Sequence, residues 1–108
     1  MKQRPQPIPA QDPDAPFEAL AEALAALEQP ADVAAFLQDL CTPAELEALA
    51  DRWRVVPLLL ESVTYREIHA RTGVSVTTIG RVARCLDHGA GGYRRAARRQ
   101  FPHLVPSH

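Results

Sequence analysis

The chain has 108 residues, which allows one small domain, and its aromatic content of only 6% limits the core that a monomer can bury. No apolar run approaches the ~20 residues of a membrane span, and the first sixteen residues contain five prolines instead of the apolar core of a secretory signal. Cys41 and Cys85 follow no disulfide framework, so we expect free thiols in a reducing compartment. These features predict a cytoplasmic protein that has no membrane partner.

The net charge of −1 conceals two halves of opposite sign. Residues 1–51 contain ten acidic and two basic residues, a charge of −8, whereas residues 52–108 contain ten arginines and three acidic residues, a charge of +7. A basic region can neutralise phosphates and an acidic region repels them. The second half is therefore the candidate for contact with nucleic acid.

Residues 1–15 are rich in proline, glutamine and aspartate, a composition typical of an unfolded arm. Asp14 can cap a helix that has Pro16 in its first turn, and Pro30 separates this helix (16–28) from a second one. Apolar residues recur at helical spacing in both segments. They are Phe17, Leu20, Leu24 and Leu27, then Val33, Phe36, Leu37 and Leu40 in the second helix, 31–41.

The third predicted helix, 43–62, begins at the segment Thr42-Pro43-Ala44-Glu45, which is a capping box with proline at the first helical position. An apolar seam runs along it at spacings of three and four. Pro57 lies inside this helix, where it removes a backbone hydrogen bond and costs roughly 3 kcal/mol if nothing compensates. We expect a kink between Trp53 and Pro57. The seam residues are Leu46, Leu49, Trp53, Val56 and Leu60.

Two further helices are joined by a short turn over residues 64–88. Thr64 and Glu67 form a second capping box, Gly73 supplies a turn residue with permissive φ, and Ser75 caps the next helix. That helix ends at a glycine-rich break. A helix, a three-residue turn and a second helix constitute a helix-turn-helix, whose second helix enters the DNA major groove.

The segment Tyr93–Gln100 is predicted as a last short helix and carries four arginines, Arg94, Arg95, Arg98 and Arg99. These arginines could contact the DNA backbone or form a solubilising helix end, and the sequence leaves both interpretations open. Residues 101–108 contain two prolines and are expected to fray. No segment has a strand pattern, so the folded domain, residues 16–100, is predicted to be all-α.

Candidate DNA contacts lie at the start of each helix of this motif. The short side chains of the first recognition turn allow close approach to the groove, where the methyls of Val76 or Thr77 can meet a thymine methyl. Arg66 can reach a guanine edge, Arg81 a guanine or a phosphate, and Arg84 a phosphate. Ile68, Val74, Ile79 and Leu86 are expected in the core. The full set of candidate DNA-binding residues is Arg66, His69, Ser75, Val76, Thr77, Thr78, Arg81 and Arg84.

Each of these residues also has a plain structural interpretation. Threonine-rich helix starts are common caps, and surface arginines often form only a solvated face. His69 can point outward to a phosphate or remain partly buried and neutral, and we expect it to point outward. Two capped helices, a glycine turn and a charge of +7 together favour the DNA-binding interpretation.

Catalytic and metal sites are not predicted. Cys85 and His88 lie one turn apart and could supply half a zinc site, but no second pair has suitable spacing. The same pair lacks an orienting carboxylate and an oxyanion loop for nucleophilic catalysis. We therefore expect neither an enzyme nor a bound cofactor or metal.

Three segments together resemble the Trp repressor superfamily, in particular its YerC/YecD-type branch. They are Cys-Thr-Pro-Ala-Glu-Leu-Glu-Ala-Leu-Ala-Asp-Arg-Trp-Arg (41–54), Tyr-Arg-Glu-Ile (65–68) and Thr-Thr-Ile-Gly-Arg-Val-Ala-Arg-Cys-Leu (77–86). The likeness covers about residues 17–96. It implies a six-helix, intertwined homodimer whose two helix-turn-helix heads lie about one DNA turn apart and bind a near-palindromic operator.

In the tryptophan-responsive members of this superfamily, a corepressor is held between two arginines, and the resemblance places Arg52 and Arg81 at their positions. Thr42 matches a further ligand-contacting threonine. This chain has Val82 where those members keep a glycine that makes room for the indole, and Cys85 where they have a serine. A valine in a close-packed pocket is expected to clash with the ring. We therefore expect no response to tryptophan, and another effector or none.

The sequence thus predicts a homodimeric, DNA-binding transcriptional regulator, of the repressor type, whose partner is double-stranded DNA. The alternative is a helical dimer that binds another component of the transcription machinery and reads no bases, which the acidic first half favours. The operator, the regulated genes and any effector are not encoded in a recognisable pattern.

Overall fold

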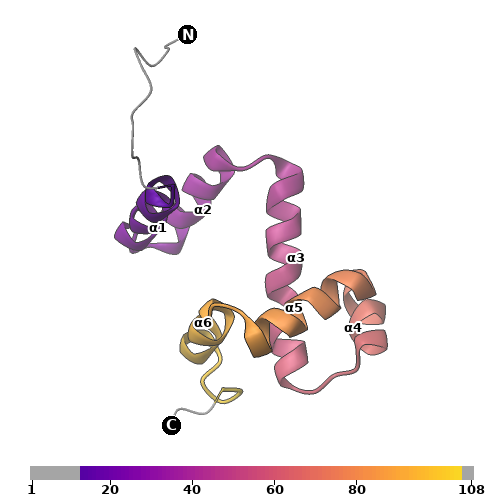
Figure 1. Cartoon of the computed structure of the whole chain (residues 1–108). Helices are drawn as coiled ribbons and strands as arrows, with labels where there is room; N and C mark the ends of the chain where they lie inside the picture. The colour runs from indigo at the N-terminus through magenta and orange to yellow at the C-terminus, as the bar shows by residue number, and fades with distance from the viewer. Residues whose placement is uncertain (1–12, 106–108) are drawn as a thin grey trace, which may run out of the picture. The chain divides into compact units, whose positions relative to one another are not determined.

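A computed structural model describes residues 13–105 of the chain. Within this range the structure contains six helices and no strand, which confirms the predicted all-α fold (Figure 1). Most of the predicted arm lies outside the described residues. In the same range, no helix combines the length and the apolar character that crossing a bilayer requires. The helices are α1 (Ala15–Ala26), α2 (Pro30–Leu40), α3 (Pro43–Leu60), α4 (Tyr65–Thr72), α5 (Val76–His88) and α6 (Gly92–Gln100).

The chain divides into two compact units, residues 1–40 and residues 41–108. In the first unit, α1 and α2 are amphipathic as predicted, yet neither helix contains a buried residue. Phe17 is 71% exposed and Leu40 is 50% exposed. The apolar faces of these two helices are therefore at most half-buried.

The second unit is organised around α3, whose capping box is complete. The Thr42 hydroxyl accepts from the backbone N–H of Glu45 (3.2 Å), and the Glu45 carboxylate accepts from the N–H of Thr42 (2.7 Å). The helix continues through Pro57 to Leu60 without interruption. Beyond the C-cap residue Glu61, Ser62 has a positive φ of 64°, and the N–H of Val63 closes the helix end by donating to the carbonyl of Leu58 (3.0 Å).

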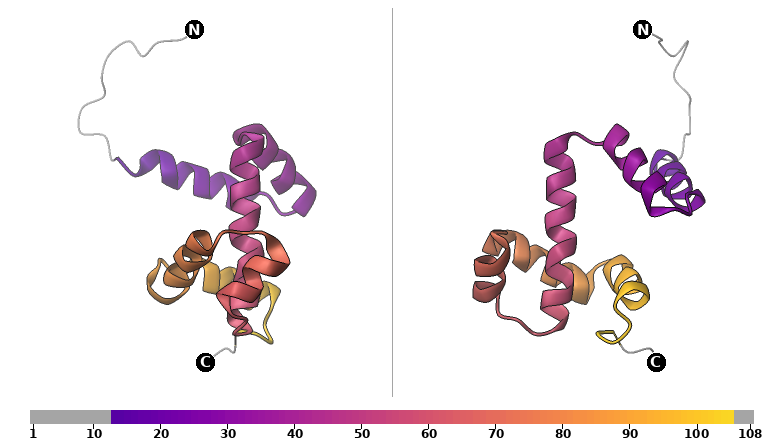
Figure 2. Two further views of the ribbon diagram at one scale, coloured as in Figure 1. Left: turned by 90° about the vertical axis from the view of Figure 1, so that its right-hand side faces the viewer. Right: turned by 180° about the vertical axis from the view of Figure 1, so that it is seen from behind.

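The core of this unit lies where α3 packs against α4, α5 and α6, an arrangement visible from two sides in Figure 2. Val55 and Val56 of α3 are fully buried. They meet the inner faces of the helix-turn-helix, and all four residues that the spacing predicted for this core are buried. These are Ile68, Val74, Ile79 and Leu86.

Aromatic side chains attach α6 to α3. The ring of Trp53 stacks on Tyr93 at 6.4 Å and on Phe101 at 5.9 Å, measured between ring centroids. Beyond α6 the chain folds back, and Val105 is buried at 5% exposure. The prediction of a frayed tail is therefore wrong for residues 101–105, because Trp53 offers them an apolar surface that local composition does not reveal. Residues 106–108 lie outside the described range.

Candidate nucleic-acid interface

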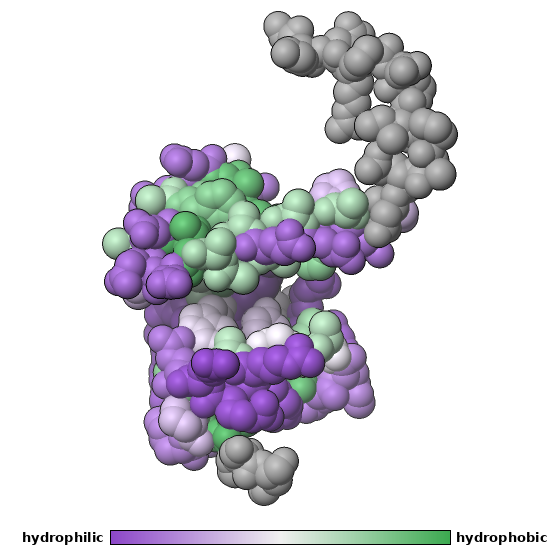
Figure 3. Space-filling view, turned by 90° about the vertical axis from the view of Figure 1, so that its left-hand side faces the viewer, coloured by the Kyte–Doolittle hydropathy of each residue, from purple (hydrophilic) through white to green (hydrophobic). Residues whose placement is uncertain are grey.

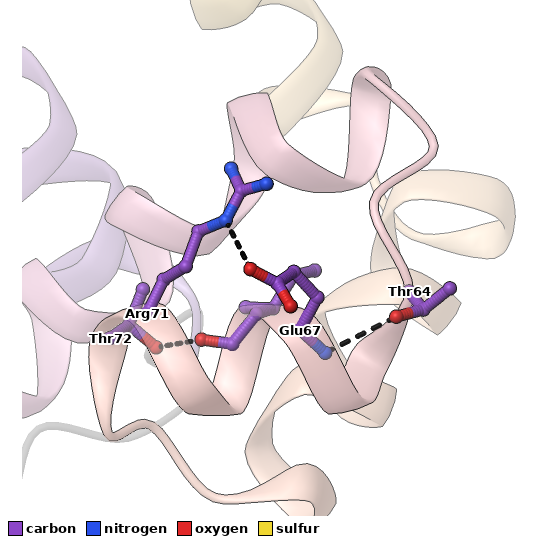
Figure 4. Close-up of polar contacts among 5 residues, drawn as sticks. Thr64, Glu67, Arg71 and Thr72 are labelled. Carbon is purple, nitrogen blue, oxygen red and sulfur yellow. Dashed lines mark hydrogen bonds and ion pairs between the residues drawn. The ribbon is translucent and has the colours of Figure 1, made fainter.

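The first helix of the motif, α4, is capped by Thr64, whose hydroxyl accepts from the N–H of Glu67 at 3.2 Å (Figure 4). The second half of the predicted capping box is replaced by another contact. The carboxylate of Glu67 accepts from Nε of Arg71 one turn later, at 2.9 Å. This ion pair uses the charge of Arg71 within α4, so Arg71 is not a free cation at this surface.

A glycine with a left-handed backbone and three hydrogen bonds hold the turn between α4 and α5. Gly73 has a φ of 78° in the left-handed region, where a side chain would be strained. The Thr72 hydroxyl donates to the carbonyl of Ile68 (2.7 Å) and accepts from the N–H of Val74 (3.0 Å). His69 contributes the third contact, since its Nδ1 lies 2.8 Å from the carbonyl oxygen of Val74. The angle between the two helices is therefore set by hydrogen bonds as well as by the core.

The contact of His69 limits what this side chain can do at a DNA surface. A carbonyl oxygen only accepts, so Nδ1 carries the proton, and in the neutral ring Nε2 is then a bare acceptor. A phosphate oxygen is also an acceptor and gains nothing from it. His69 is exposed, and its ring fastens the turn through Nδ1.

A similar restriction applies to Ser75 at the start of α5. Its hydroxyl donates to the hydroxyl of Thr78 (3.0 Å) and accepts from the N–H of Thr78 (3.1 Å). The single proton of Ser75 is thereby used inside the cap, whereas Thr78 retains its own hydroxyl proton as a donor. Of the two predicted contacts, Thr78 is the one that remains able to donate.

The helix α5 has two distinct faces. Ile79, Val82 and Leu86 point into the core, and the opposite face is exposed. Val76 stands at the N-terminus of this helix with 51% of its surface exposed, which leaves its methyls available to a thymine methyl. Thr77, Arg81 and Arg84 are exposed at spacings of three and four along the same side.

The arginines of the second unit fall into two groups. Arg54, Arg71 and Arg94 form ion pairs with Asp51, Glu67 and Asp87. Arg94 also donates through Nε to the carbonyl of Leu86 (2.9 Å), which caps the end of α5. The others have no ion-pair partner within residues 13–105. These are Arg52, Arg66, Arg81, Arg84, Arg95, Arg98 and Arg99.

Apart from Arg52, which is half-buried on α3, the unpaired arginines occur in two places, the exposed side of the helix-turn-helix and α6. In the lower part of Figure 3, where α6 faces the viewer, strongly hydrophilic residues form a continuous band. On α6, three arginines are exposed, Arg95, Arg98 and Arg99. Arg94 differs from these three arginines, because its side chain contacts Asp87 and the carbonyl of Leu86.

The residues predicted for a corepressor pocket are spread over α3 and α5. Thr42 is engaged in the cap of α3, Arg52 is half-buried on the same helix, and Arg81 is exposed on α5. Val82 is only 1% exposed and belongs to the core. The side chain of Val82 therefore faces the packed side of α5.

An open apolar hollow of about 360 Å³ lies at the end of α5, and of the predicted pocket residues only Cys85 lines it. The rest of its wall comes from the glycine-rich segment. Within residues 13–105, no group of three or more potential metal ligands comes together. The lining residues are Cys85, Gly89, Ala90, Gly91, Gly92 and Tyr93.

Comparisons with known proteins agree with this architecture. The Trp repressor protein family matches residues 15–101. The chain is 46% identical over 61 residues to YerC of Bacillus subtilis, a protein whose function is uncharacterized. That segment covers 56% of this chain and 59% of YerC, so it spans less than two thirds of the relative's length.

Two solved structures resemble the whole helical arrangement. A TrpR-like protein from Eubacterium eligens shares 36% identity with a TM-score of 0.73, over 79% of this chain and 88% of the other. A Trp repressor candidate from Staphylococcus aureus shares 30% identity with a TM-score of 0.75, over 87% of this chain and 91% of the other. Both similarities extend well beyond the helix-turn-helix, to the elements that support it.

Proposed function

The chain belongs to the Trp repressor family, and we propose that it is a cytoplasmic transcriptional regulator that binds a specific DNA sequence as a homodimer. It acts as a repressor by occupying promoter DNA. The observation that carries this proposal is the exposed side of α5, where unpaired Arg81 and Arg84 follow an open, apolar and hydroxyl-bearing first turn. Such a surface supplies cations for phosphates and short side chains for base edges.

The dimer is supported by apolar surface that the chain leaves uncovered. Phe17, Leu40 and Leu49 are 71%, 50% and 44% exposed, and they lie on α1, α2 and the first half of α3. Burial of such faces against a second copy would supply the core that a small chain lacks. Two helix-turn-helix heads related by twofold symmetry would then read half-sites about 34–36 Å apart, as a near-palindromic operator requires.

The test is an unbiased selection of duplexes from random DNA at low salt. We expect one near-palindromic sequence to be enriched, and its affinity to fall steeply with salt because phosphate contacts release counterions. The double variant Arg66→Ala with Thr77→Ala is expected to lose roughly tenfold to a hundredfold in affinity for that duplex. Arg54→Ala is the matched control, since Arg54 pairs with Asp51 on α3. Absence of any enriched sequence, or unchanged binding by the double variant, would refute the proposal.

Tryptophan is not the corepressor in this proposal, because Val82 is packed into the core where the ring would need space. Calorimetry with tryptophan should give no binding heat at micromolar concentrations. A micromolar signal that disappears in Arg81→Ala would show that the pocket forms despite the valine. Absence of binding heat would mean that tryptophan is not the effector of this protein.

A second candidate function rests on the first unit. Residues 13–40 contain six acidic residues and no basic one, next to exposed apolar side chains. A surface of this kind also suits a basic protein of the transcription machinery. Binding to DNA that is weak and insensitive to salt, together with a stable protein partner recovered by the full chain, would favour this function over DNA reading.

A further inference from the structure

Tyr65 lies over the recognition helix, at a position where that helix has no side chain. A Cβ atom placed on Gly80 would be 3.8 Å from Cε2 of Tyr65 and 4.0 Å from Nη1 of Arg84. The ring from α4 and the guanidinium from α5 are therefore neighbours across the glycine. Tyr65 is 41% exposed, so its ring is not a core residue.

Gly80 belongs to the side of α5 that faces away from the core. Ile79 and Val82, its near neighbours in sequence, are buried on the inner face. Thr77 and Arg84 are exposed three residues before and four residues after Gly80, which places them on its side of the helix. The group formed by Tyr65, Gly80 and Arg84 is consequently part of the exposed surface of the motif.

Both polar groups of this cluster are donors without partners. Within residues 13–105 the Tyr65 hydroxyl makes no hydrogen bond, and Arg84 forms neither a hydrogen bond nor an ion pair. A guanidinium donates only, and a phenol hydroxyl donates readily to an anion. Two donors from two helices on either side of a small residue suit a compact anionic group that carries several acceptor oxygens.

We propose that Tyr65 and Arg84 together hold one phosphate of the DNA strand that borders the recognition helix, and that Gly80 keeps the space between them open. This inference rests on the proposed DNA-binding function and assigns to it a phosphate contact and a residue, Tyr65. Glycine weakens a helix interior, and a space for a phosphate explains its presence in the middle of α5. The sequence pattern did not single out Tyr65, because nothing local shows that its ring reaches a helix fifteen residues later.

The test measures duplex affinity for Tyr65→Phe, which retains the ring over Gly80 and removes only the hydroxyl. Fluorescence anisotropy is recorded with the duplex enriched by selection and with an unrelated duplex, because a phosphate contact acts on both. Tyr65→Phe is expected to weaken binding to both duplexes by about three- to tenfold. Tyr93→Phe is the matched control, since Tyr93 stacks on Trp53 and lies on α6.

The salt dependence separates the two members of the cluster. Arg84→Gln should reduce the slope of log affinity against log salt by about 0.9, the value for one phosphate charge on duplex DNA. Tyr65→Phe removes no charge and should leave the slope unchanged while lowering affinity. Arg54→Gln controls for the loss of an arginine elsewhere on the unit.

Replacement of single phosphates by neutral methylphosphonates locates the contact. For the wild-type protein, a methylphosphonate at one position of each half-site should lower affinity. The same replacement should not lower the affinity of Tyr65→Phe or Arg84→Gln, because these variants already lack the contact. The double variant should lose less than the sum of the single variants, because both act on the same group. Gly80→Met, whose side chain would occupy the space, should bind as weakly as Tyr65→Phe while its melting temperature stays at or above that of the wild type.

The outcomes distinguish this inference from the proposed function. If the wild type binds DNA and both Tyr65→Phe and Arg84→Gln bind equally well, the phosphate contact is refuted and the function stands. If the wild type binds every duplex alike but the variants are weaker, sequence-specific regulation fails and the contact stands. If the wild type binds no duplex, or the variants lose only a protein partner, the assignment to phosphate is overturned.

Discussion

The two units of the chain carry the same kind of apolar periodicity and reach opposite results. The helices α3 to α6 bury Val55, Ile68 and Ile79 completely, whereas α1 and α2 bury nothing. The helix-turn-helix therefore has its core within residues 41–108. The first unit has apolar faces of the same sequence type that stay at most half-buried, with Phe17 and Leu40 exposed. This is the feature expected of an element that completes an assembly.

Charge separates the two units as well. Residues 13–40 carry only acidic charges, while every arginine that the structure describes lies beyond residue 51. The acidic unit repels phosphate, so the proposed contact with DNA falls to α4, α5 and the exposed arginines of α6, such as Arg98. The proposed function thus assigns assembly and DNA binding to different parts of a short chain.

The largest expected effect comes from the core of the second unit. Ile79→Ala should lower the free energy of unfolding by about 2–5 kcal/mol, because Ile79 is fully buried and its removal leaves a cavity. Urea denaturation at a fixed protein concentration measures this. Ala34→Gly changes an exposed position of α2. If it destabilises the protein as much as Ile79→Ala, the difference in burial between the two units does not determine stability.

The first unit should respond through assembly. Phe17→Ser with Leu40→Ser is expected to weaken dimer formation by about 1.5–3 kcal/mol for each side chain that the dimer buries. Sedimentation across a dilution series measures this. The variant should dissociate into monomers at a higher protein concentration than the wild type does. A wild-type chain that is monomeric at every concentration would contradict the expectation.

The turn of the motif should show an intermediate effect. Gly73→Ala places a side chain at φ 78°, and the strain is expected to cost about 1–2 kcal/mol. Thermal unfolding measures the loss. Ser62→Gly is the opposite control, since Ser62 already has a φ of 64° and the change should raise stability. Equal melting temperatures for the two variants would argue against the left-handed geometry at both sites.

The smallest expected effect is a gain in stability within α5. Gly80→Ala should stabilise the protein by about 0.5–1 kcal/mol, because its Cβ would meet Tyr65 and Arg84 only at ordinary contact distances. Calorimetric melting detects a gain of this size. A loss of stability would mean that the new Cβ lies closer to the ring of Tyr65 than the 3.8 Å measured to its Cε2.

Local patterns predicted those features that depend on neighbouring residues. The caps at Thr42, Thr64 and Ser75 are present because each hydroxyl reaches an N–H three residues away. The buried residues of the motif were likewise predictable, since helical spacing places them on one face. The helix bounds agree to within one or two residues, where fraying makes any assignment uncertain.

Features that depend on distant contacts were missed. Phe101 stacks on Trp53, which lies some fifty residues earlier in the chain, and Val105 joins the core cluster formed by α3 to α6. The ring of Tyr65 over Gly80 requires the crossing of α4 and α5, which no local pattern specifies.

The amino-acid sequence by itself determined the six helices, the caps, the turn at Gly73 and the family to which the chain belongs, because these depend on short-range geometry and on residue patterns. Only the tertiary structure decided which polar groups remain free. His69, Ser75 and Arg94 are engaged within the protein, whereas Tyr65 and Arg84 are not. The physical reason is that a donor is available only if no acceptor reaches it in the folded chain, and the fold sets those distances.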